Sequence, residues 1–267
     1  MKIDLNTLFR LEGKTAVVTG AGRGIGKAVA DLFASVGARV VVADILADNA
    51  AAVAEELRRD GMQALAVTAD VSSESSVQAM YAAAAREFGS VDILVHSAAI
   101  FPKHPLLDIP AEEWDRIHSV NLRGSLFCNR EAVKHMKAGG KGGAIVNIAS
   151  VSGIREVIYH NIAYNTTKAG LINMTRTIAL EFAGDKIRAN AVLPGGTATE
   201  GAKLATEDMM KRGLSIGGPL AGHHERILLG TMGAPDDIAN ACLFLASPAA
   251  KCITGIEVAV DGGFLIS

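Results

Sequence analysis

A tyrosine and a lysine four residues apart, Tyr164 and Lys168, have the types and the spacing needed for proton transfer. Residues 163–182 have the pattern of a helix, and side chains four residues apart lie on the same helix face. A nearby ammonium favours tyrosinate and lowers the phenol pKa from its reference value of about 10. Such a phenol can exchange a proton with a reacting hydroxyl. The same spacing is common on exposed helix faces, so the pair indicates this chemistry only together with other signals.

A glycine-rich turn provides a second signal, because residues 19–26 have the sequence TGAGRGIG. The turn lies between a short apolar run, 15–19, and a helical pattern. Glycines let the backbone approach a pyrophosphate, whose charge then meets the amides and the positive end of the helix. The position between strand and helix therefore predicts a dinucleotide site. The residues expected to hold the cofactor in this turn are Gly20, Arg23, Gly24, Ile25 and Gly26.

Asp44 indicates which nucleotide is bound. It ends the second predicted strand, where dinucleotide folds place the group that meets the adenosine ribose. A carboxylate there accepts from the ribose hydroxyls and repels a 2′-phosphate, which favours NAD over NADP. Arg23 weighs the other way, since a cation in the glycine turn attracts that phosphate, but Ile45 supplies no second cation. We expect NAD, with NADP less favoured; the alternative for Asp44 is a helix N-cap.

The scaffold that must position these residues follows from an alternation along the chain. Short β-branched apolar runs alternate with longer segments of helical periodicity, which is typical of parallel strands joined by crossover helices. We expect strands near residues 15–19, 39–43, 64–68, 93–96, 144–148, 188–193 and 257–260. We expect helices near residues 25–36, 47–59, 73–88, 111–136, 163–182 and 236–246. The predicted fold is an α/β, doubly wound Rossmann domain whose seven-stranded parallel sheet has helices on both faces.

No linker, repeat or low-complexity segment divides the chain, so residues 1–267 are predicted to form a single domain. Residues 195–233 lack clear periodicity, and a long loop in a compact domain is usually functional. We expect a substrate lid there. Helix ends are expected at a capping serine, Ser72 or Ser73, and at Gly37, Gly61, Gly89 and Gly184.

Composition excludes several classes of protein. The chain has 267 residues, of which 49% are hydrophobic and 20% charged, so it is neither disordered nor fibrous. Its 26 Lys and Arg against 28 Asp and Glu give a net charge of -2 without a basic block, so nucleic acid is not an expected partner. It has no signal-peptide pattern and no apolar run of about 18 residues, so no membrane partner is expected. Three cysteines without a CxxC pair predict a cytoplasmic protein.

Taken together, these motifs resemble those of the short-chain dehydrogenase/reductase family over nearly the whole chain. The matching segments follow the family's order: TGAGRGIG at 19–26, Asp70-Val71, DILVHSAA at 92–99, Asn121, IVNIAS at 145–150, YNTTK at 164–168, IRANAVLPGGTAT at 187–199 and ITGIEVAVDGG at 253–263. The resemblance implies a hydride transfer between nicotinamide and a carbonyl or secondary alcohol. It also implies a homotetramer, with the helices that carry Asn121 and Tyr164 and the C-terminal segment at subunit contacts.

The resemblance further implies a role for each matching residue. Tyr164 would be the general acid/base, and Lys168 would lower its pKa and hold the nicotinamide ribose. Ser150, with Ser152 as a competitor, would steady the developing alkoxide. Asn121 would hold a water that connects Lys168 to solvent. Further cofactor contacts are implied for Asp70, Val71, Ser97, Ala98, Pro194, Thr197 and Thr199.

Two segments depart from the family pattern or suggest other chemistry. His96-Ser97-Ala98-Ala99 stands where the family usually has Asn-Asn-Ala-Gly, and Ala99 lacks the access of glycine to positive φ, which puts the backbone path in question. His96 is either a second titrating group or a satisfied core histidine, and we favour the latter. His223-His224 suggest a metal, but adjacent side chains diverge and no carboxylate-rich cluster accompanies them, so no metal is expected.

The substrate is expected to be a small or medium secondary alcohol or its ketone, cyclic, either a hydroxysteroid or a polyol. The flanking segments 100–106, 154–162 and 200–229 are mostly apolar, which favours a ring or alkyl body. One alternative is a 3-oxoacyl thioester reductase using NADPH, against which Asp44 counts. Two others are a non-catalytic nucleotide-sensing protein, which would not need the four catalytic-type residues together, and an NAD-using epimerase or lyase.

Overall fold

Seven parallel strands form the centre of the molecule in the order β3-β2-β1-β4-β5-β6-β7. The computed structural model describes residues 5–156, 158–214 and 223–267. The strands are β1 Thr15–Thr19, β2 Arg39–Asp44, β3 Ala64–Thr68, β4 Ile93–His96, β5 Gly143–Ile148, β6 Ile187–Pro194 and β7 Glu257–Val260. The predicted strands are confirmed to within one residue at each end.

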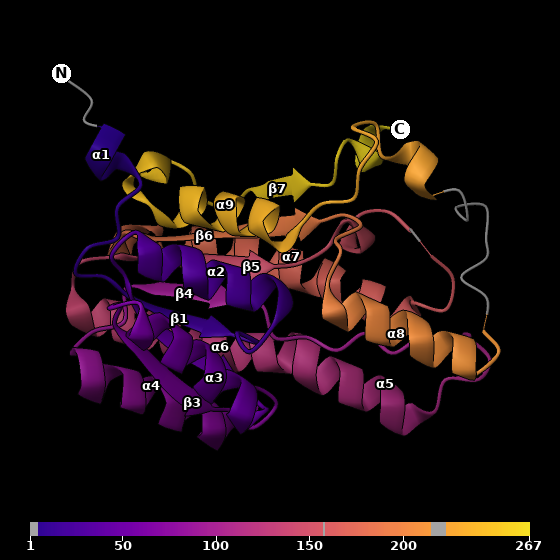
Figure 1. Ribbon diagram of the computed structural model, residues 1–267, viewed down its shortest axis with the longest axis horizontal. Helices are drawn as coiled ribbons and strands as arrows, with labels where there is room; N and C mark the ends of the chain where they lie inside the picture. Colours follow the sequence, from indigo (N-terminus) through magenta and orange to yellow (C-terminus); the bar gives the residue numbers. More distant parts are fainter. Residues whose placement is uncertain (1–4, 157, 215–222) are drawn as a thin grey trace.

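Helices cover both faces of this sheet, as Figure 1 shows. They are α1 Leu5–Leu8, α2 Gly24–Ser35, α3 Ala47–Arg59, α4 Glu74–Phe88, α5 Ala111–His118, α6 Gly124–Gly139, α7 Ile162–Phe182, α8 Glu200–Lys211 and α9 Pro235–Ala246. Successive side chains of a strand point to opposite faces. Val18 of β1 therefore packs with Phe33 of α2 and Cys242 of α9, whereas Val17 packs with Met80 of α4 and Cys128 of α6. The predicted doubly wound α/β fold is confirmed.

The helix predicted over residues 111–136 is interrupted. It consists of α5, a π-helical turn at Ser119–Arg123 (η1), and α6. A π turn contains one residue more than an α turn and often lies at a functional site. The apolar periodicity continues through the turn, so the sequence pattern did not reveal it.

The segment predicted as a lid without regular structure contains α8, so this part of the prediction is wrong. Met209 is the buried residue of this helix, at 2% exposure, so α8 has too narrow an apolar stripe to produce a clear period. Thr199 caps the helix, since its Oγ1 accepts a hydrogen bond from the Ala202 amide at 3.1 Å. A threonine followed by an acidic residue, Glu200, was the available signal for a helix start.

The predicted helix ends are mostly observed. Ser73 caps α4, because its hydroxyl accepts from the Ser76 amide. Gly37, Gly61 and Gly89 follow α2, α3 and α4 with positive φ. Gly184 does not end α7, because that helix runs on into a 3-10 turn, Ala183–Asp185, and Lys186 takes the left-handed conformation instead.

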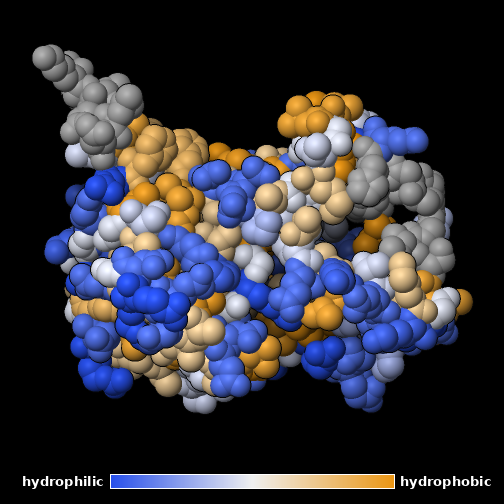
Figure 2. All heavy atoms as spheres, viewed as in Figure 1, coloured by the Kyte–Doolittle hydropathy of each residue, from blue (hydrophilic) through white to orange (hydrophobic). Residues whose placement is uncertain are grey.

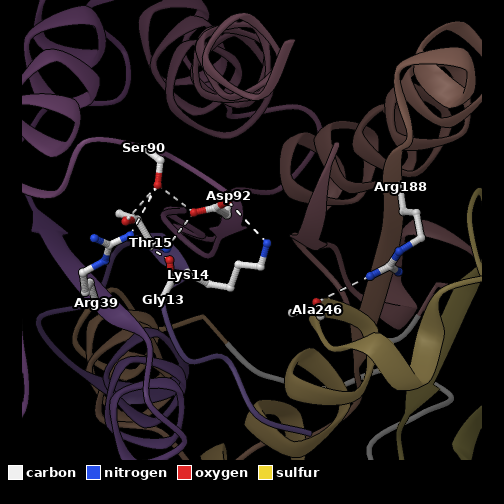
Figure 3. Close-up of polar contacts among 8 residues, drawn as sticks. All are labelled: Gly13, Lys14, Thr15, Arg39, Ser90, Asp92, Arg188 and Ala246. Atoms are coloured by element: carbon white, nitrogen blue, oxygen red, sulfur yellow. Dashed lines mark hydrogen bonds and ion pairs between the residues drawn. The ribbon is translucent and has the colours of Figure 1, made fainter. Parts of the chain in front are cut away.

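A polar cluster ties together the amino ends of three strands (Figure 3). Asp92, just before β4, accepts hydrogen bonds from the Thr15 amide at 3.0 Å and from the Ser90 hydroxyl at 2.8 Å. Its other oxygen lies 3.6 Å from Lys14 Nζ. Arg39, at the start of β2, donates to the Gly13 carbonyl at 2.7 Å. These contacts leave the opposite, carboxyl edge of the sheet for the groups that could bind a nucleotide.

Among the helices that the structure describes, none has both the length and the apolar character required to cross a membrane.

Candidate active site at the carboxyl edge of the sheet

The glycine turn joins β1 to α2 and leaves the first amides of the helix without a protein cap. Arg23 occupies the N-cap position, and its side chain makes no capping bond. A Cβ on Gly20 would lie 2.8 Å from Ala98 Cα, and one on Gly26 would lie 2.1 Å from the Gly20 carbonyl oxygen. Both positions therefore require glycine. The uncapped amides and the helix dipole fit a pyrophosphate, and binding at this turn remains a prediction.

Asp44 lies beside this turn at the end of β2. Its Oδ2 accepts a hydrogen bond from the Gly22 amide at 2.9 Å, and its Oδ1 accepts from the Leu46 amide at 3.0 Å. Leu46, rather than Asp44, occupies the N-cap position of α3. Arg23 does not turn toward this carboxylate, because its guanidinium lies 3.7 Å from the carboxylate of Glu200 on α8.

The end of β4 is held against β1 by Thr19. The hydroxyl of Thr19 accepts hydrogen bonds from the amides of Ser97 and Ala98, at 3.2 and 3.3 Å. Ala99 is not among the residues with positive φ; within the described chain, His160 and Lys186 are the non-glycine residues with that conformation. The expected disturbance from losing a glycine at Ala99 is therefore not observed.

His96 is enclosed, with 1% of its surface exposed. Its Nδ1 hydrogen-bonds to Thr19 Oγ1 at 2.9 Å, whereas its Nε2 has no partner. Burial, together with the charge of Lys168, lowers the pKa of His96 to about 3. It is therefore a neutral core histidine, as we favoured, although only one of its two nitrogens is satisfied.

The end of β3 forms its own turn. Asp70 Oδ1 accepts from the Ser72 amide at 2.9 Å and from the Ser72 hydroxyl at 2.7 Å. Val71 is buried and lies against Gly124 at the start of α6. The adenine contacts implied for Asp70 and Val71 remain predictions.

Tyr164, Lys168 and Ser150 lie together where α7 passes the end of β5. Lys168 Nζ lies 5.5 Å from the centre of the Tyr164 ring and donates to the Ile148 carbonyl at 2.8 Å. The Ser150 side chain lies close enough to the Tyr164 phenol to lower its pKa. Ser150 Oγ also accepts from the Ser152 amide at 3.1 Å, so Ser152 contributes its backbone to this cluster. The structure thus brings together the three residues that the sequence analysis proposed to act together.

The pKa values of Tyr164 and Lys168 differ from those expected from their spacing. Burial raises the pKa of Tyr164 to about 12, against the lowering effect of the Ser150 hydrogen bond. Burial also lowers the pKa of Lys168 to about 7, so this ammonium is only partly charged at neutral pH. The predicted lowering of the phenol pKa is therefore not observed in the protein alone. Spacing alone identified the neighbours but gave no measure of their burial.

Asn121 lies in the π turn and is 1% exposed. Its Oδ1 accepts from the Ile100 amide at 2.9 Å, while its Nδ2 donates to the Ile100 carbonyl at 2.7 Å and to Thr167 Oγ1 at 3.3 Å. Asn121 therefore ties the segment after β4 to α7. The water-holding role implied for it remains a prediction.

The lid leaves the sheet at Pro194, the last residue of β6. Thr197 pairs with Gly233 in a parallel bridge, and its hydroxyl donates to the Gly195 carbonyl at 3.2 Å. Thr197 and Thr199 thus build the base of the lid, and their predicted nicotinamide contacts remain predictions.

The helix α8 reaches the segment that follows β4. Arg212, just after α8, hydrogen-bonds to His104 Nδ1 at 3.2 Å. Val157 and residues 215–222 of the predicted substrate region lie outside the described residues, as do the side chains of His223 and His224. Among the described residues, no group of three or more His, Cys, Asp or Glu is gathered as metal ligands would be.

One residue of this site was not identified from the sequence. Lys103 is 6% exposed, and its Nζ lies 5.4 Å from the centre of the Tyr164 ring and 5.7 Å from that of Phe101. The segment 100–106 was expected to flank the substrate, but a lysine in a loop has no periodic neighbours that would predict its burial.

Known proteins resemble this chain over nearly its whole length. Residues 20–265 match a family model described as enoyl-(acyl carrier protein) reductase. The chain is 40% identical over 258 residues to L-rhamnose 1-dehydrogenase (NAD(P)(+)) of Azotobacter vinelandii, covering 95% of this chain and 97% of that protein. It is 40% identical over 252 residues to cis-4-hydroxycyclohexanecarboxylate dehydrogenase of Sinomonas cyclohexanicum, covering 94% and 96%.

A solved structure has the same fold. The crystal structure of a short-chain type dehydrogenase/reductase from Mycobacterium marinum superposes with a TM-score of 0.90 at 35% identity, covering 97% of this chain and 98% of that chain.

Proposed function

The chain belongs to the short-chain dehydrogenase/reductase family and is an alcohol oxidoreductase that uses NAD(P). We propose that it converts a cyclic secondary alcohol to its ketone, with Tyr164 as general base. The observation that carries the proposal is the closeness of the half-buried Tyr164 to Ser150 and Lys168. Two neighbouring hydroxyls can share one substrate oxygen.

Each residue of the cluster then has a definite task. Ser150 donates to the substrate oxygen and stabilises the negative charge that develops there. Tyr164 takes the proton of the substrate hydroxyl during oxidation and returns it during reduction. When bound, the nicotinamide would supply the hydride chemistry. Lys168 would hold the ribose and, as an ammonium, favour the ionised phenol, and the proton leaving Tyr164 would reach solvent through a water held by Asn121.

A phenol with a pKa of about 12 is a weak base at neutral pH, so its acidity must change when the site is filled. A charged Lys168 favours tyrosinate, and the positive charge of an oxidised nicotinamide would favour it as well. The base is therefore generated mainly in the loaded enzyme.

NAD is the proposed cofactor. Asp44 presents a carboxylate at the end of β2, next to the glycine turn, and Arg23 is paired with Glu200. The carboxylate repels a 2′-phosphate, and the cation that would attract this phosphate is engaged by α8.

The proposed substrate is a ring-bearing alcohol, a hydroxysteroid or a polyol. The names of both relatives describe oxidation of a hydroxylated ring, a sugar in one case and a cyclohexane in the other. The thioester reductase alternative receives support from the description of the family model, but Asp44 disfavours the NADPH that it would need.

We also propose that the protein works in the cytoplasm as one folded unit per chain, assembled as a homotetramer. Its three cysteines are free, and Cys128 and Cys242 are buried in the two layers that flank the sheet. Figure 2 shows hydrophobic residues gathered near the C-terminus, and Leu228, Leu229 and Ile266 are exposed in this region.

The decisive experiment follows NADH absorbance with NAD or NADP and a panel of cyclic alcohols, sugars, polyols and hydroxysteroids. We expect NADH to form with at least one ring-bearing alcohol and NAD to be preferred. Tyr164→Phe should reduce kcat by about 10²- to 10⁴-fold while NADH binding persists, because the phenol hydroxyl is not part of the glycine turn.

Two outcomes would contradict the proposal. NADH binding without oxidation of any alcohol or reduction of any ketone would favour the nucleotide-sensing alternative. Product formation without a net change in NADH would favour an epimerase or lyase.

A further inference from the structure

Lys103 places a positive charge inside the protein without a negative partner. Its Nζ donates to Asn161 Oδ1 at 2.5 Å, and the aromatic rings of Phe101 and Tyr164 are its other neighbours. It makes no ion pair with any residue that the structure describes. An ammonium has three N–H donors, so one neutral amide leaves part of its capacity unused.

A buried charge without a counter-charge is costly, which is why buried lysines in proteins are normally paired. Lys103 is 6% exposed, so solvent does not replace the missing partner. Burial lowers the pKa of Lys103 to about 8, which still leaves the group mostly charged at neutral pH. Such a site indicates a counter-ion that arrives from outside the chain.

The position of Lys103 indicates what brings that counter-ion. Lys168 approaches Tyr164 from α7 and is held by the Ile148 carbonyl of β5. Lys103 instead comes from the segment after β4, which the bond from the His104 amide to the His160 carbonyl ties to the approach to α7. Its neighbour Phe101 lies against Gly201 of α8. Lys103 thus lies among the three segments expected to enclose the substrate.

We propose that Lys103 binds a carboxylate carried by the substrate, so that this enzyme oxidises a hydroxy acid, an alcohol that also bears an acidic group. The proposal rests on the proposed function, because it takes Tyr164 as the group that meets the reacting hydroxyl. Lys103 Nζ lies 5.4 Å from the centre of the Tyr164 ring, which places the ammonium beside the residue proposed to meet the reacting hydroxyl. Asn161 then acts as the fixed acceptor that orients the ammonium.

The test compares alcohols of the same shape and different charge. The probes are 4-hydroxycyclohexanecarboxylate, its carboxamide and cyclohexanol, oxidised with NAD at pH 7. We expect the carboxylate to be preferred over the carboxamide. Lys103→Met should reduce kcat/KM for the carboxylate roughly 10- to 100-fold, mainly through KM, and change it less than about threefold for the carboxamide. Lys141→Met, which replaces an exposed lysine in the turn before β5, is the matched control and should change neither.

The unmodified enzyme provides a second measurement that does not depend on how a variant folds. As pH rises through about 8, Lys103 loses its charge, so the preference for carboxylate over carboxamide should decline. Oxidation of the carboxamide should not decline, because Tyr164 becomes a better base as pH rises.

Two results would overturn the proposal. One is an equal kcat/KM for carboxylate and carboxamide in the unmodified enzyme. The other is an equal loss for both probes in Lys103→Met, which would make Lys103 a positioning residue that acts on Tyr164.

Failure of the proposed function is recognised separately, as no NADH from any of the three alcohols. Lys103 is then judged by binding. With NADH present, cyclohexanecarboxylate should raise Tm. Loss of this rise in Lys103→Met, while Lys141→Met keeps it, supports the carboxylate site. No rise in the unmodified protein refutes it.

Discussion

At Tyr164, burial and hydrogen bonding act on the phenol in opposite directions. Burial raises its pKa, and the hydrogen bond with Ser150 lowers it. Because burial dominates, the reactivity of this residue depends on every group that favours tyrosinate. Ser150 is therefore expected to influence the pH dependence of the reaction as well as its rate.

Replacing Ser150 with alanine should lower kcat at pH 7 by roughly 10²- to 10³-fold, as removal of an oxyanion donor does. It should also move the alkaline rise of kcat/KM to higher pH, because the phenol loses a bond that stabilises its ionised form. Ser152→Ala is the control, since Ser152 contributes its amide. A rise at the same pH in Ser150→Ala and the unmodified enzyme would show that Ser150 does not set the acidity of the phenol.

His96 predicts a sensitivity of stability to acid. Its pKa is about 3 in the folded protein, against 6.5 for a free histidine, so the unfolded chain binds a proton first as pH falls. The free energy of unfolding should be unaffected by His96 above pH 6.5. It should decrease by about 2 kcal/mol between pH 7 and pH 5.

Urea unfolding at the two pH values tests this expectation. His96→Asn should lose much less stability over that range than the unmodified protein, whereas His135→Asn, which replaces a half-buried histidine, should behave like the unmodified protein. An identical pH slope in His96→Asn would mean that other groups cause the loss.

Some site residues could be predicted from the sequence and others could not, for a physical reason. Asp44 and Ser150 lie at the ends of strands, and Tyr164 lies one helical turn before Lys168. These positions are encoded by nearby residues. Lys103 becomes significant only through burial against Phe101 and Tyr164, which depends on contacts distant in sequence.

The same distinction applies to helices and strands. The parallel strands are buried on both faces, so each appears as a short apolar run between turn residues, and their limits were predictable. The helix α8 was missed because its inner face is anchored mainly by Met209. The π turn at Ser119–Arg123 was missed because an extra residue in a helix leaves the surrounding composition unchanged.

We expect Asp92 to stabilise the amino edge of the sheet without taking part in the reaction. Asp92→Ala removes the acceptor of the buried Thr15 amide, so the free energy of unfolding should fall by about 1–3 kcal/mol. Because Asp92 lies at the amino edge of the sheet, kcat at a temperature where the variant is folded should not change (Figure 3).

Asp60→Ala, which removes an exposed carboxylate just after α3, is the control for a simple loss of charge. A kcat for Asp92→Ala that falls in parallel with stability, although the protein is fully folded, would contradict the separation of the two edges.

For the whole molecule, the strand order gathers residues from distant parts of the sequence. The glycine turn follows β1, Asp44 ends β2, and Ser150 follows β5, yet all lie at one edge (Figure 1). The proposed nucleotide contacts come mostly from the first half of the chain, and the proposed proton-transfer residues Ser150, Tyr164 and Lys168 come from the second. Neither half alone contains the proposed chemistry.

Exposed apolar side chains on α6 and α7 bear on how the subunits assemble. Leu180 on α7 is 81% exposed and Leu126 on α6 is 45% exposed, and we expect the proposed homotetramer to cover these side chains. Light scattering should give about four times the subunit mass of 27.7 kDa. Leu180→Asp should reduce that mass, whereas Leu107→Asp, in the loop before α5, should not. A mass of one subunit for the unmodified protein would refute the homotetramer.

The π turn at Ser119–Arg123 affects how the protein would respond to deletion mutations. A helix that accommodates one extra residue as a π turn keeps the segments before and after it facing as they would without that residue. Loss of a single codon within this turn would therefore leave α5 and α6 seated on the sheet, while Asn121 would lose its inward place. We therefore expect deletion of a single codon at this place in the gene to preserve the fold and abolish the activity.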